Sequence, residues 1–376
     1  MVTVREFTAQ HGIGRGAGEA PTATRKMARG RGARTNVSGR FESNKRLLFD
    51  DGWQTLDDQP ALKTEVFEEQ PKGMINRNSS PDLGFDLSIN PYRGCEHGCS
   101  YCYARPAHAY VGLSPGLDFE SKLFAKPNAA EVLRRELLAP GYKPSLIVLG
   151  GNTDAYQPIE RRYRITRQIL ELLLEFKNPV GIVTKSALVL RDLDILQAMA
   201  EKDLVNVAIS VTSLDGALAR KMEPRAATPM KRMQALEVLT ASGIPTTVMV
   251  APVVPAINDS EIEAILKAAS AAGVKEAGYI ILRLPLELRE LFREWLQSEF
   301  PDRAAHVLSL LKSMREGKDY DPTFGKRMKG VGPYAWSIGR RFEVMAKRLG
   351  LNEFKRELRT DLFERPPQPG DQLSLL

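Results

Sequence analysis

The chain has 376 residues, of which 43% are hydrophobic and 26% are charged, and its formal net charge is +7. This length and balance predict a soluble globular protein with a large core. No run approaches the roughly eighteen consecutive apolar residues of a membrane span, and the N-terminus lacks the apolar core of a signal peptide. Because cysteine is sparse, as in a reducing compartment, we expect a cytoplasmic protein without a membrane segment.

Residues 1–80 show no sustained helical or strand period, and we expect them to form a flexible, basic N-terminal arm. Residues 1–50 carry ten Lys and Arg against four Asp and Glu. Four glycines within residues 12–18 and the Arg- and Gly-rich stretch 29–34 favour a chain without fixed structure. The arm is either a solvated tail or a segment that tracks nucleic acid, since flexible Arg-rich segments release counterions from phosphates.

From residue 81 to residue 290, short apolar segments alternate with segments of helical period. One helix is clearly bounded, because Thr228 suits its N-cap, Pro229 its first position and Gly243 its end. The expected strands are 87–91, 145–149, 180–184, 205–211, 246–251 and 278–282, and the expected helices are 129–138, 165–176, 193–199, 229–242 and 261–271.

This alternation predicts one α/β domain over residues 81–290, with six parallel strands joined by right-handed helical crossovers. Six such units suit either an incomplete barrel or a doubly wound sheet, and the pattern does not separate the two. In both folds, ligands bind at the carboxyl ends of the strands. Polar residues recur at these ends, in 150–154, 184–186 and 210–213, although the same residue types are common in ordinary turns.

All three cysteines of the chain, Cys95, Cys99 and Cys102, fall within eight residues. Three is an odd number and the spacings are too short for unstrained disulfides, so the group suits one inorganic centre instead. Zinc would need a fourth ligand, either His97 or His108. A four-iron cluster also accepts cysteines from one loop, and three of them would leave one iron open to a further ligand. The spacing favours the cluster but leaves both alternatives open.

The spacing Cys95-x3-Cys99-x-Tyr101-Cys102 resembles the signature of the radical S-adenosylmethionine (SAM) enzymes. Further stretches resemble the branch of that superfamily that contains spore photoproduct lyase and its uncharacterised relatives. This resemblance covers about residues 85–290, and it implies an α/β fold, a partial (β/α)6 radical SAM barrel with a helical C-terminal extension. The stretches that carry it are 90–94, 101–104, 153–160, 184–186 and 223–225.

The resemblance implies two cofactors, a 4Fe–4S cluster and SAM, and a low-potential electron donor as a partner. Cys95, Cys99 and Cys102 would hold three irons, and SAM would bind the fourth through its amino and carboxylate groups. An electron passed through the cluster would cleave SAM to methionine and a 5′-deoxyadenosyl radical, which abstracts hydrogen from a substrate. The residues implied to contact SAM are Tyr101, Gly150, Gly151, Asn152, Thr153, Lys185, Ser210 and Arg225.

Within this resemblance, each SAM contact has a chemical reason. The two glycines let the backbone approach the methionine amino group, for which Asn152 or Thr153 supplies a side-chain partner. Asn152 stands where many relatives carry an acid, so this sequence departs from the family pattern at that contact. A cation such as Lys185 or Arg225 suits the SAM carboxylate, and a hydroxyl such as that of Ser210 suits the ribose.

The sequence also departs from the lyase, which quenches its radical with a cysteine outside the cluster motif. This chain has no cysteine left over, so we expect a tyrosine, Tyr156 or Tyr279, to donate hydrogen instead. The leading hypothesis is radical chemistry on a nucleic acid or nucleotide, with a repair-like role. The alternatives are radical modification of a peptide or small molecule, and a non-catalytic, zinc-stabilised nucleic-acid-binding protein.

Residues 291–362 are expected to form a helical, basic extension. Residues 326–359 carry ten Lys and Arg against three Asp and Glu. Together with Tyr334 and Trp336 this charge suits phosphate contact and base stacking, or else a basic amphipathic helix whose apolar side packs inward. The expected helices are 286–300, 303–314 and 334–349.

Residues 363–376 are expected to form a flexible tail, because a proline-rich spacer leads to a short apolar end. Gln372–Leu376 resembles the pentapeptide by which bacterial DNA-processing proteins dock on the β sliding clamp. Such motifs place leucines in a preformed pocket at the end of a flexible tether. The alternative is a tail that folds back onto the helical extension.

Overall fold

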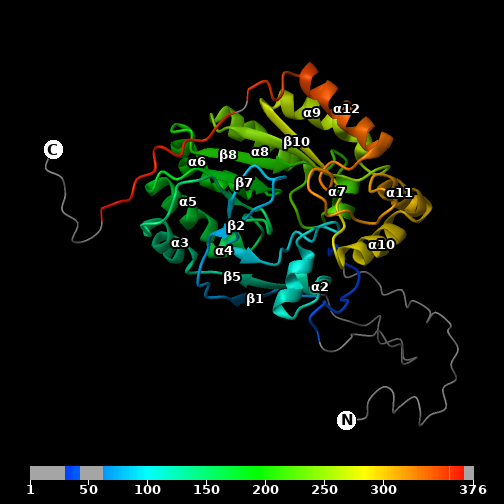
Figure 1. Cartoon of the computed structure of the whole chain (residues 1–376), viewed down its shortest axis with the longest axis horizontal. Coiled ribbons are helices and arrows are strands. Elements are labelled where there is room, and N and C mark those ends of the chain that lie inside the picture. Colours follow the sequence, from blue (N-terminus) through cyan, green and yellow to red (C-terminus); the bar gives the residue numbers. More distant parts are fainter. Residues whose placement is uncertain (1–29, 43–61, 355, 368–376) are drawn as a thin grey trace, which may run out of the picture. The chain divides into compact units, whose positions relative to one another are not determined.

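A seven-stranded sheet forms the centre of the computed structural model, which describes residues 30–42, 62–354 and 356–367 (Figure 1). The strand order is β10-β9-β8-β7-β6-β3-β2. All neighbours in it pair in parallel except β2, which pairs antiparallel with β3 at one edge. The strands are β2 (Asn76–Arg77), β3 (Leu87–Ile89), β6 (Ile147–Leu149), β7 (Val180–Thr184), β8 (Val205–Ser210), β9 (Thr246–Val253) and β10 (Glu276–Ile281).

Helices connect the parallel strands as the alternation predicts, and the sheet stays open between its β10 and β2 edges. The prediction of an α/β partial (β/α)6 barrel is therefore confirmed. The N-terminus of α8 forms as expected, with Thr228 Oγ1 accepting a hydrogen bond from Lys231 N (3.4 Å) and Pro229 in the first position. The helices are α3 (Ala129–Leu138), α4 (Glu160–Tyr163), α5 (Ile165–Glu175), α6 (Leu193–Ala200), α7 (Gly216–Met222), α8 (Pro229–Ala241) and α9 (Ile262–Ala271).

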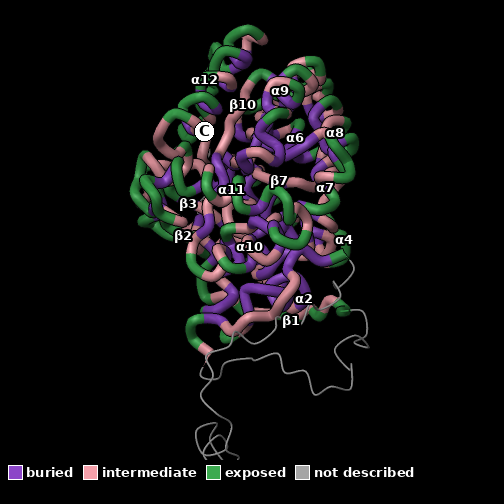
Figure 2. The backbone as a smooth tube through the Cα atoms, turned by 90° about the vertical axis from the view of Figure 1, so that its right-hand side faces the viewer, coloured by how far each residue is buried: buried purple, intermediate pink, exposed green. Residues whose placement is uncertain are grey.

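The core lies around the parallel strands. Ile182, Val207 and Val248, on three neighbouring strands, are at most 1% exposed. Figure 2 shows the buried backbone in the interior and the exposed backbone toward the outside. Along β7 and β9, buried residues alternate with half-buried ones. Because most residues of both kinds are apolar, the strands appear in the sequence as short apolar runs, and the sequence locates all six of them.

The sequence does not predict the second, smaller sheet, whose order is β1-β5-β4. Here β1 (Glu65–Glu68) pairs in parallel with β5 (Lys122–Ala125), and β4 (Tyr92–Arg93) pairs antiparallel with β5. Every residue of β1 is exposed or half-buried, so no alternation of apolar and polar residues marks it. This sheet matters for the site because β4 leads directly into the cysteine loop, residues 94–104.

Part of the expected flexible arm is packed against the cysteine loop. A Cβ on Gly32 would lie 1.6 Å from Gly98 O, so the two backbones are in direct contact. The buried Glu120 carboxylate accepts hydrogen bonds from Gly32 N (3.0 Å) and Ala33 N (2.7 Å). The Arg-Gly stretch is therefore fixed at this point, and the expectation of a flexible arm over residues 1–80 does not hold here.

The described residues at the C-terminal end of the arm are also fixed in the structure. Residues 62–80 contain β1 and β2, and the Met74 side chain is only 1% exposed. The Arg31 guanidinium joins the two parts of the arm, since it donates to Leu62 O and Thr64 Oγ1 (3.0 Å each). Residues 1–29 and 43–61 lie outside the described part of the chain.

The segment between α11 (Pro301–Ser313) and α12 (Gly332–Arg348) connects the two edges of the open sheet. Met328 O accepts a hydrogen bond from Ile281 N (2.9 Å) at the β10 edge. Arg327 pairs with Asp82 (2.5 Å), which lies in the connection between β2 and β3 at the other edge. Gly325 N also donates to Asp82 Oδ1 (2.6 Å). Arg327 is therefore committed to an internal ion pair.

The helical C-terminal extension is confirmed, with α10 (Leu288–Glu299), α11 (Pro301–Ser313) and α12 (Gly332–Arg348). Helix α12 packs on the edge strand β10 through Phe342 and Tyr279, whose ring centroids are 4.7 Å apart. Of the two aromatic residues considered for base stacking, Tyr334 donates to Asp259 Oδ2 (2.7 Å) and Trp336 is 67% exposed. Within the described ranges, no helix is both long and apolar enough to cross a membrane.

The first residues of the expected tail, 363–376, are docked on the domain. The Phe363 ring lies 5.3 Å from that of Tyr142 and 6.1 Å from that of Phe176. Gln372–Leu376 lies outside the described residues, so docking on a sliding clamp stays a prediction.

Candidate active site

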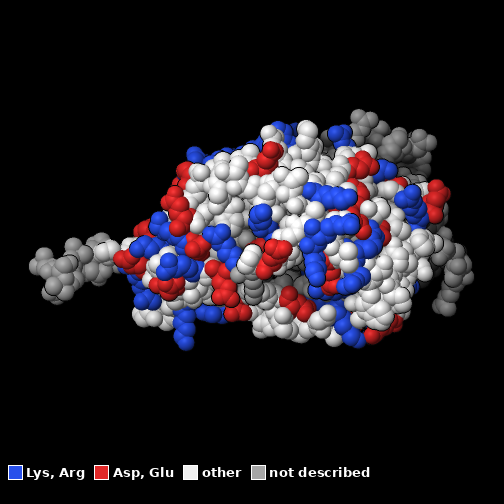
Figure 3. Space-filling model, turned by 90° about the horizontal axis from the view of Figure 1, so that it is seen from above, with Lys and Arg blue, Asp and Glu red and all other residues white. Residues whose placement is uncertain are grey.

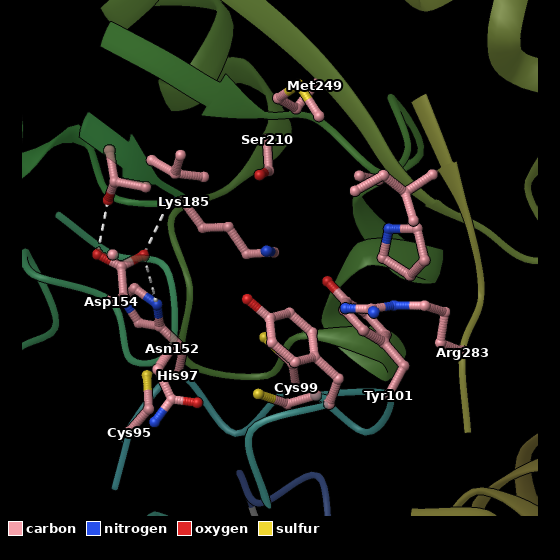
Figure 4. A pocket seen from close by; sticks show the side chains of 18 of the residues that line it. Cys95, His97, Cys99, Tyr101, Asn152, Asp154, Lys185, Ser210, Met249 and Arg283 are labelled. Carbon is pink, nitrogen blue, oxygen red and sulfur yellow. Dashed lines mark hydrogen bonds and ion pairs between the residues drawn. The ribbon is translucent and has the colours of Figure 1, made fainter. Parts of the chain in front are cut away.

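The three cysteines line one cavity at the carboxyl ends of the parallel strands (Figure 4). The loop that carries them runs from β4 to the 3₁₀ helix at Arg105–Val111. Facing them are Gly150 and Asp154 after β6, Lys185 after β7 and Ser210 at the end of β8. Parallel strands bring all their carboxyl ends to one edge of a sheet, so residues distant in sequence meet here.

Hydrogen bonds from three separate elements fix the backbone of the cysteine loop. Cys95 N donates to Phe119 O (2.9 Å), and Ser100 N donates to Met222 O (3.0 Å). The buried Gln157 side chain bonds the loop backbone at two further points, at 3.0 Å each. The loop therefore has a defined shape before any metal binds.

The thiols form a dry, soft set of donors. Cys95 and Cys99 are both 7% exposed, and burial raises the pKa of each thiol. At neutral pH these two free thiols are therefore protonated, and iron binding must release their protons. Thiolates are the ligands that iron–sulfur clusters use. Three thiols from one fixed loop, all lining a cavity that can hold a further ligand, fit a 4Fe–4S cluster.

The two histidines considered as zinc ligands have other partners. His97 Nδ1 lies 3.3 Å from Asp154 Oδ2. His108 Nε2 contacts Lys122 O (3.0 Å), and its ring packs edge-on against Phe119 at 5.5 Å. In the part of the chain that the structure describes, no three His, Cys, Asp or Glu side chains surround one point as a single metal ion requires. The positions of the two histidines favour the cluster over zinc.

Asp154 joins the cysteine loop to the end of β7. Its carboxylate accepts hydrogen bonds from Thr184 Oγ1 (2.7 Å) and Lys185 N (2.8 Å) and contacts His97, as the dashed lines in Figure 4 show. Burial opposes its ionisation, but His97 and these hydrogen bonds hold the pKa of Asp154 well below its usual value. The Asp154 carboxylate thus holds the walls of the cavity together and is not assigned to a ligand.

The Lys185 side chain projects into the cavity, with Nζ 5.8 Å from the ring centroid of Tyr101 (Figure 4). Burial opposes its charge, but the Cys99 thiolate, when it forms, and the Glu223 carboxylate outweigh this effect and raise the pKa of Lys185. The ammonium therefore stays charged inside the cavity, where it suits a carboxylate ligand.

A buried network fixes the Tyr101 ring. The Tyr101 hydroxyl donates to Glu223, which also pairs with Arg232. Arg232 in turn donates to Ser210 O (3.0 Å). Burial opposes the ionisation of Glu223, but the Arg232 charge lowers its pKa. The network thereby links the cysteine loop, the end of β8 and α8.

Tyr103 and Arg283 lie together in the cavity lining. The sequence places Arg283 directly after the last expected strand but assigns neither residue a role in the site. Tyr103 is 45% exposed, so it lies where the cavity opens to solvent. Its hydroxyl donates to Gly151 O, and the Arg283 guanidinium carbon lies 4.7 Å from its ring centroid. A signal was present, because Tyr103 directly follows the third cysteine.

Most residues implied to contact SAM do meet at the cavity. Gly151 does not line it but borders it through its bond to Tyr103. The residues that line it with the three cysteines are Tyr101, Gly150, Asn152, Lys185 and Ser210.

Two of the implied SAM contacts lie outside the cavity lining. Thr153 is 1% exposed, and its hydroxyl donates to Tyr92 O (2.8 Å). Arg225 pairs with Glu96 on the outer side of the cysteine loop. Both side chains hold the loop in place, and their expected contact with SAM is not supported.

The two tyrosines expected to donate hydrogen also lie outside the cavity lining. Tyr156 is fully buried and donates to Asp192 Oδ2 (3.1 Å). Tyr279 packs against Phe342 under α12. The structure thus gives neither of them contact with the cavity, whose tyrosines are the two that flank the third cysteine.

We expect the Gly150→Ala change to disrupt the turn after β6. Gly150 has φ of 84°, and a Cβ there would lie 2.0 Å from Val183 O. Strain and clash together should lower the free energy of unfolding by about 3 kcal/mol or more. Gly151→Ala is the matched control, because the nearest atoms would be 3.9 and 4.0 Å away. Urea denaturation should place the control within about 1 kcal/mol of the wild type; equal losses in the two variants would contradict this account.

Comparison with known proteins identifies the family. Residues 89–269 match the sequence model of the radical SAM superfamily. An uncharacterised protein of Mycobacterium tuberculosis is 35% identical over 249 residues, which are 66% of this chain and 72% of that protein. An uncharacterised protein of Methanocaldococcus jannaschii is 29% identical over 199 residues, 53% of this chain and 71% of that protein.

Among solved structures, spore photoproduct lyase complexed with dinucleoside spore photoproduct aligns with a TM-score of 0.55 over 76% of this chain and 80% of that chain. The two sequences are 14% identical, so the likeness concerns the fold. The superfamily match spans the cysteine loop and the strands β6 to β9, whose ends line the cavity, whereas β10 lies beyond it. The chain belongs to the radical SAM superfamily.

Proposed function

We propose that the chain cleaves SAM reductively at its cysteine loop and uses the resulting radical chemistry on a nucleotide unit of a nucleic acid. Members of this superfamily carry a 4Fe–4S cluster and SAM and need an electron donor, and the chain shares these cofactors. The bound cluster and SAM together supply a 5′-deoxyadenosyl radical, which abstracts hydrogen.

The observation that carries the proposal is that three thiols and one ammonium group line the same cavity. Cys95, Cys99 and Cys102 would hold the cluster from one side. Lys185, which remains charged beside them, would bind the carboxylate of SAM.

Further cavity residues suit the remaining groups of SAM. The Asn152 side chain faces the cavity (Figure 4), and its amide oxygen would accept a hydrogen bond from the amino group of SAM. The Ser210 hydroxyl would bond the ribose. Gly150 also lines the cavity, and glycine is needed there for the turn itself, because its φ is 84° and a Cβ would lie 2.0 Å from Val183 O.

The opening of the cavity supports a nucleotide unit as substrate. The Arg283 guanidinium lies over one face of the Tyr103 ring, so a base would stack on the other face, and the guanidinium would supply a charge for phosphate. The lyase with the similar fold is complexed with a dinucleoside, which belongs to the same chemical class. The lyase reaction itself is not proposed, since all three cysteines of this chain lie in the loop.

Anaerobic reconstitution with iron and sulfide tests the enzyme class. We expect about four irons for each chain and formation of 5′-deoxyadenosine from SAM when dithionite is added. Cys95→Ala, Cys99→Ala and Cys102→Ala should each abolish both, because each removes a ligand. A colourless protein with one zinc and no labile sulfide would refute the proposal in favour of a zinc-stabilised binder.

Lys185→Gln is expected to weaken SAM binding by removing the charge that faces the carboxylate. A hydrogen bond to a charged group contributes about 1.5–3 kcal/mol, so affinity should fall about tenfold to a hundredfold. Decarboxylated SAM serves as the matched ligand, and its affinity should change little. Calorimetry on the anaerobic holoenzyme measures both. An equal loss for the two ligands would place Lys185 elsewhere in the site.

Substrate class is tested by hydrogen transfer from deuterated candidates. Deuterated oligonucleotides should pass label to 5′-deoxyadenosine, and deuterated peptides should not. Arg283→Gln should reduce labelling from oligonucleotides while preserving SAM cleavage in their absence, since Arg283 is assigned to the substrate. Label from peptides alone would favour the alternative of peptide modification.

A further inference from the structure

We propose that a basic groove behind the cysteine loop is the docking surface for an acidic protein that carries one electron. The groove is formed by the loops after β6 and β7, the turn before α8 and the cysteine loop itself. We define it by three cations, Arg161, Arg225 and Lys231, and by His97 at its inner wall. This inference rests on the proposed function, because an electron carrier is needed only where the loop holds a redox centre.

His97 places the groove next to the thiols. It is 3% exposed, and it lines both the groove and the active-site cavity. Along the chain it stands between Cys95 and Cys99, and its carbonyl accepts a hydrogen bond from Arg225 N (3.2 Å). A carrier seated in the groove is therefore separated from the cysteine ligands by this one buried side chain.

The charge of the groove favours an acidic partner. Its three cations are exposed, and none of the described residues that line it carries a carboxylate. Lys231 Nζ donates only to the neutral Gln234 side chain (3.2 Å), whereas Arg225 pairs with Glu96. Complementary charge speeds the encounter of proteins, and electron-transfer interfaces are characteristically small.

An electron carrier fits this position better than a nucleic acid does. The groove and the cavity have only His97 in common among their described lining residues. A nucleic acid held in the groove would not present a base to the cavity, whose opening lies at Tyr103. Electron transfer needs only proximity to the ligands. Another face of the loop is covered by Gly32, which contacts Gly98, so the carrier is not expected there.

The step balances with one electron. The reduced carrier would give up one electron to the cluster that the three cysteines would hold, so that the carrier would be oxidised by one electron and the cluster reduced by one. No covalent bond forms or breaks. The residues of the groove bind and orient the carrier, and they take no part in hydrogen abstraction.

Charge reversal tests the docking surface. The double variant Arg161→Glu/Lys231→Glu reverses the charge of two groove cations, which have no carboxylate partner among the described residues that line the groove. The control is Arg340→Glu/Lys347→Glu on α12, which makes the same change in net charge at two exposed positions. Figure 3 looks onto the side that carries α9 and α12, where Lys and Arg are mixed with Asp and Glu.

The probe is a purified acidic flavodoxin in its fully reduced form. We measure its Kd for the anaerobic holoenzyme by calorimetry at several salt concentrations, and the rate at which it bleaches the cluster. The groove variant should bind about tenfold or more weakly, with a flatter salt dependence and a matching loss of rate. The control should stay within about twofold of the wild type. Reduction by dithionite should be the same in all three proteins.

If the groove variant bound flavodoxin with the same affinity as the wild type, the proposal would be overturned. A variant that lost binding to an oligonucleotide while keeping its affinity for flavodoxin would also overturn it, since the groove would then serve nucleic acid. Failure of the proposed function itself is distinguishable, because it shows as a protein that assembles no cluster or as absent SAM cleavage with dithionite.

Discussion

The cysteine loop is held between two buried carboxylate–guanidinium pairs, and the rest of the site depends on them. Glu120 pairs with Arg105 on one side, with both side chains fully buried. Glu223 pairs with Arg232 on the other, at 0% and 2% exposure. Removing one partner of such a pair leaves an unpaired charge in the protein interior and lowers the free energy of unfolding by about 3–5 kcal/mol. Replacing a whole pair by apolar residues often leaves the stability unchanged. The pairs are therefore better explained by the geometry they impose than by net stability.

Each pair extends to the backbone that carries the chemistry. Arg105 donates twice to Cys99 O (3.0 and 2.8 Å), which fixes one thiol in the middle of the loop. Arg232 donates to Ser210 O (3.0 Å), which fixes the strand end across the cavity. Asp154 adds the third link, from the loop to the end of β7. The walls of the cavity are thus tied to one another by buried ionic groups, and a small ligand can be bound without rebuilding the site.

The parts of the fold that the sequence predicts are those set by local pattern. The six parallel strands appear in the sequence as short apolar runs, and Gly150, Lys185 and Ser210 follow from their places at strand ends. The failures are residues whose partners are distant. Arg225 pairs with Glu96, which is 129 positions away, and no periodicity in the sequence indicates that contact.

The packing of residues 30–34 on the cysteine loop is likewise a contact between residues that are distant in the sequence. An Arg-Gly stretch has the composition of a disordered segment, yet its small residues are what allow backbone to lie directly on backbone at Gly98. Composition reports the freedom of an isolated segment. Composition does not indicate that the buried carboxylate of Glu120 accepts hydrogen bonds from two backbone N–H groups of this segment.

The loop consequently has three faces with three different neighbours. Residues 30–34 cover one, the cavity occupies the second, and the basic groove lies against the third. If the electron carrier docked at the cavity opening, it would compete with the substrate for Tyr103 and Arg283. Because the groove and the cavity share only His97 among their described lining residues, the proposed carrier and the proposed substrate would not compete for one surface. Under these two proposals, the electron would arrive with the substrate already bound, so that the radical would form only where hydrogen is available to it.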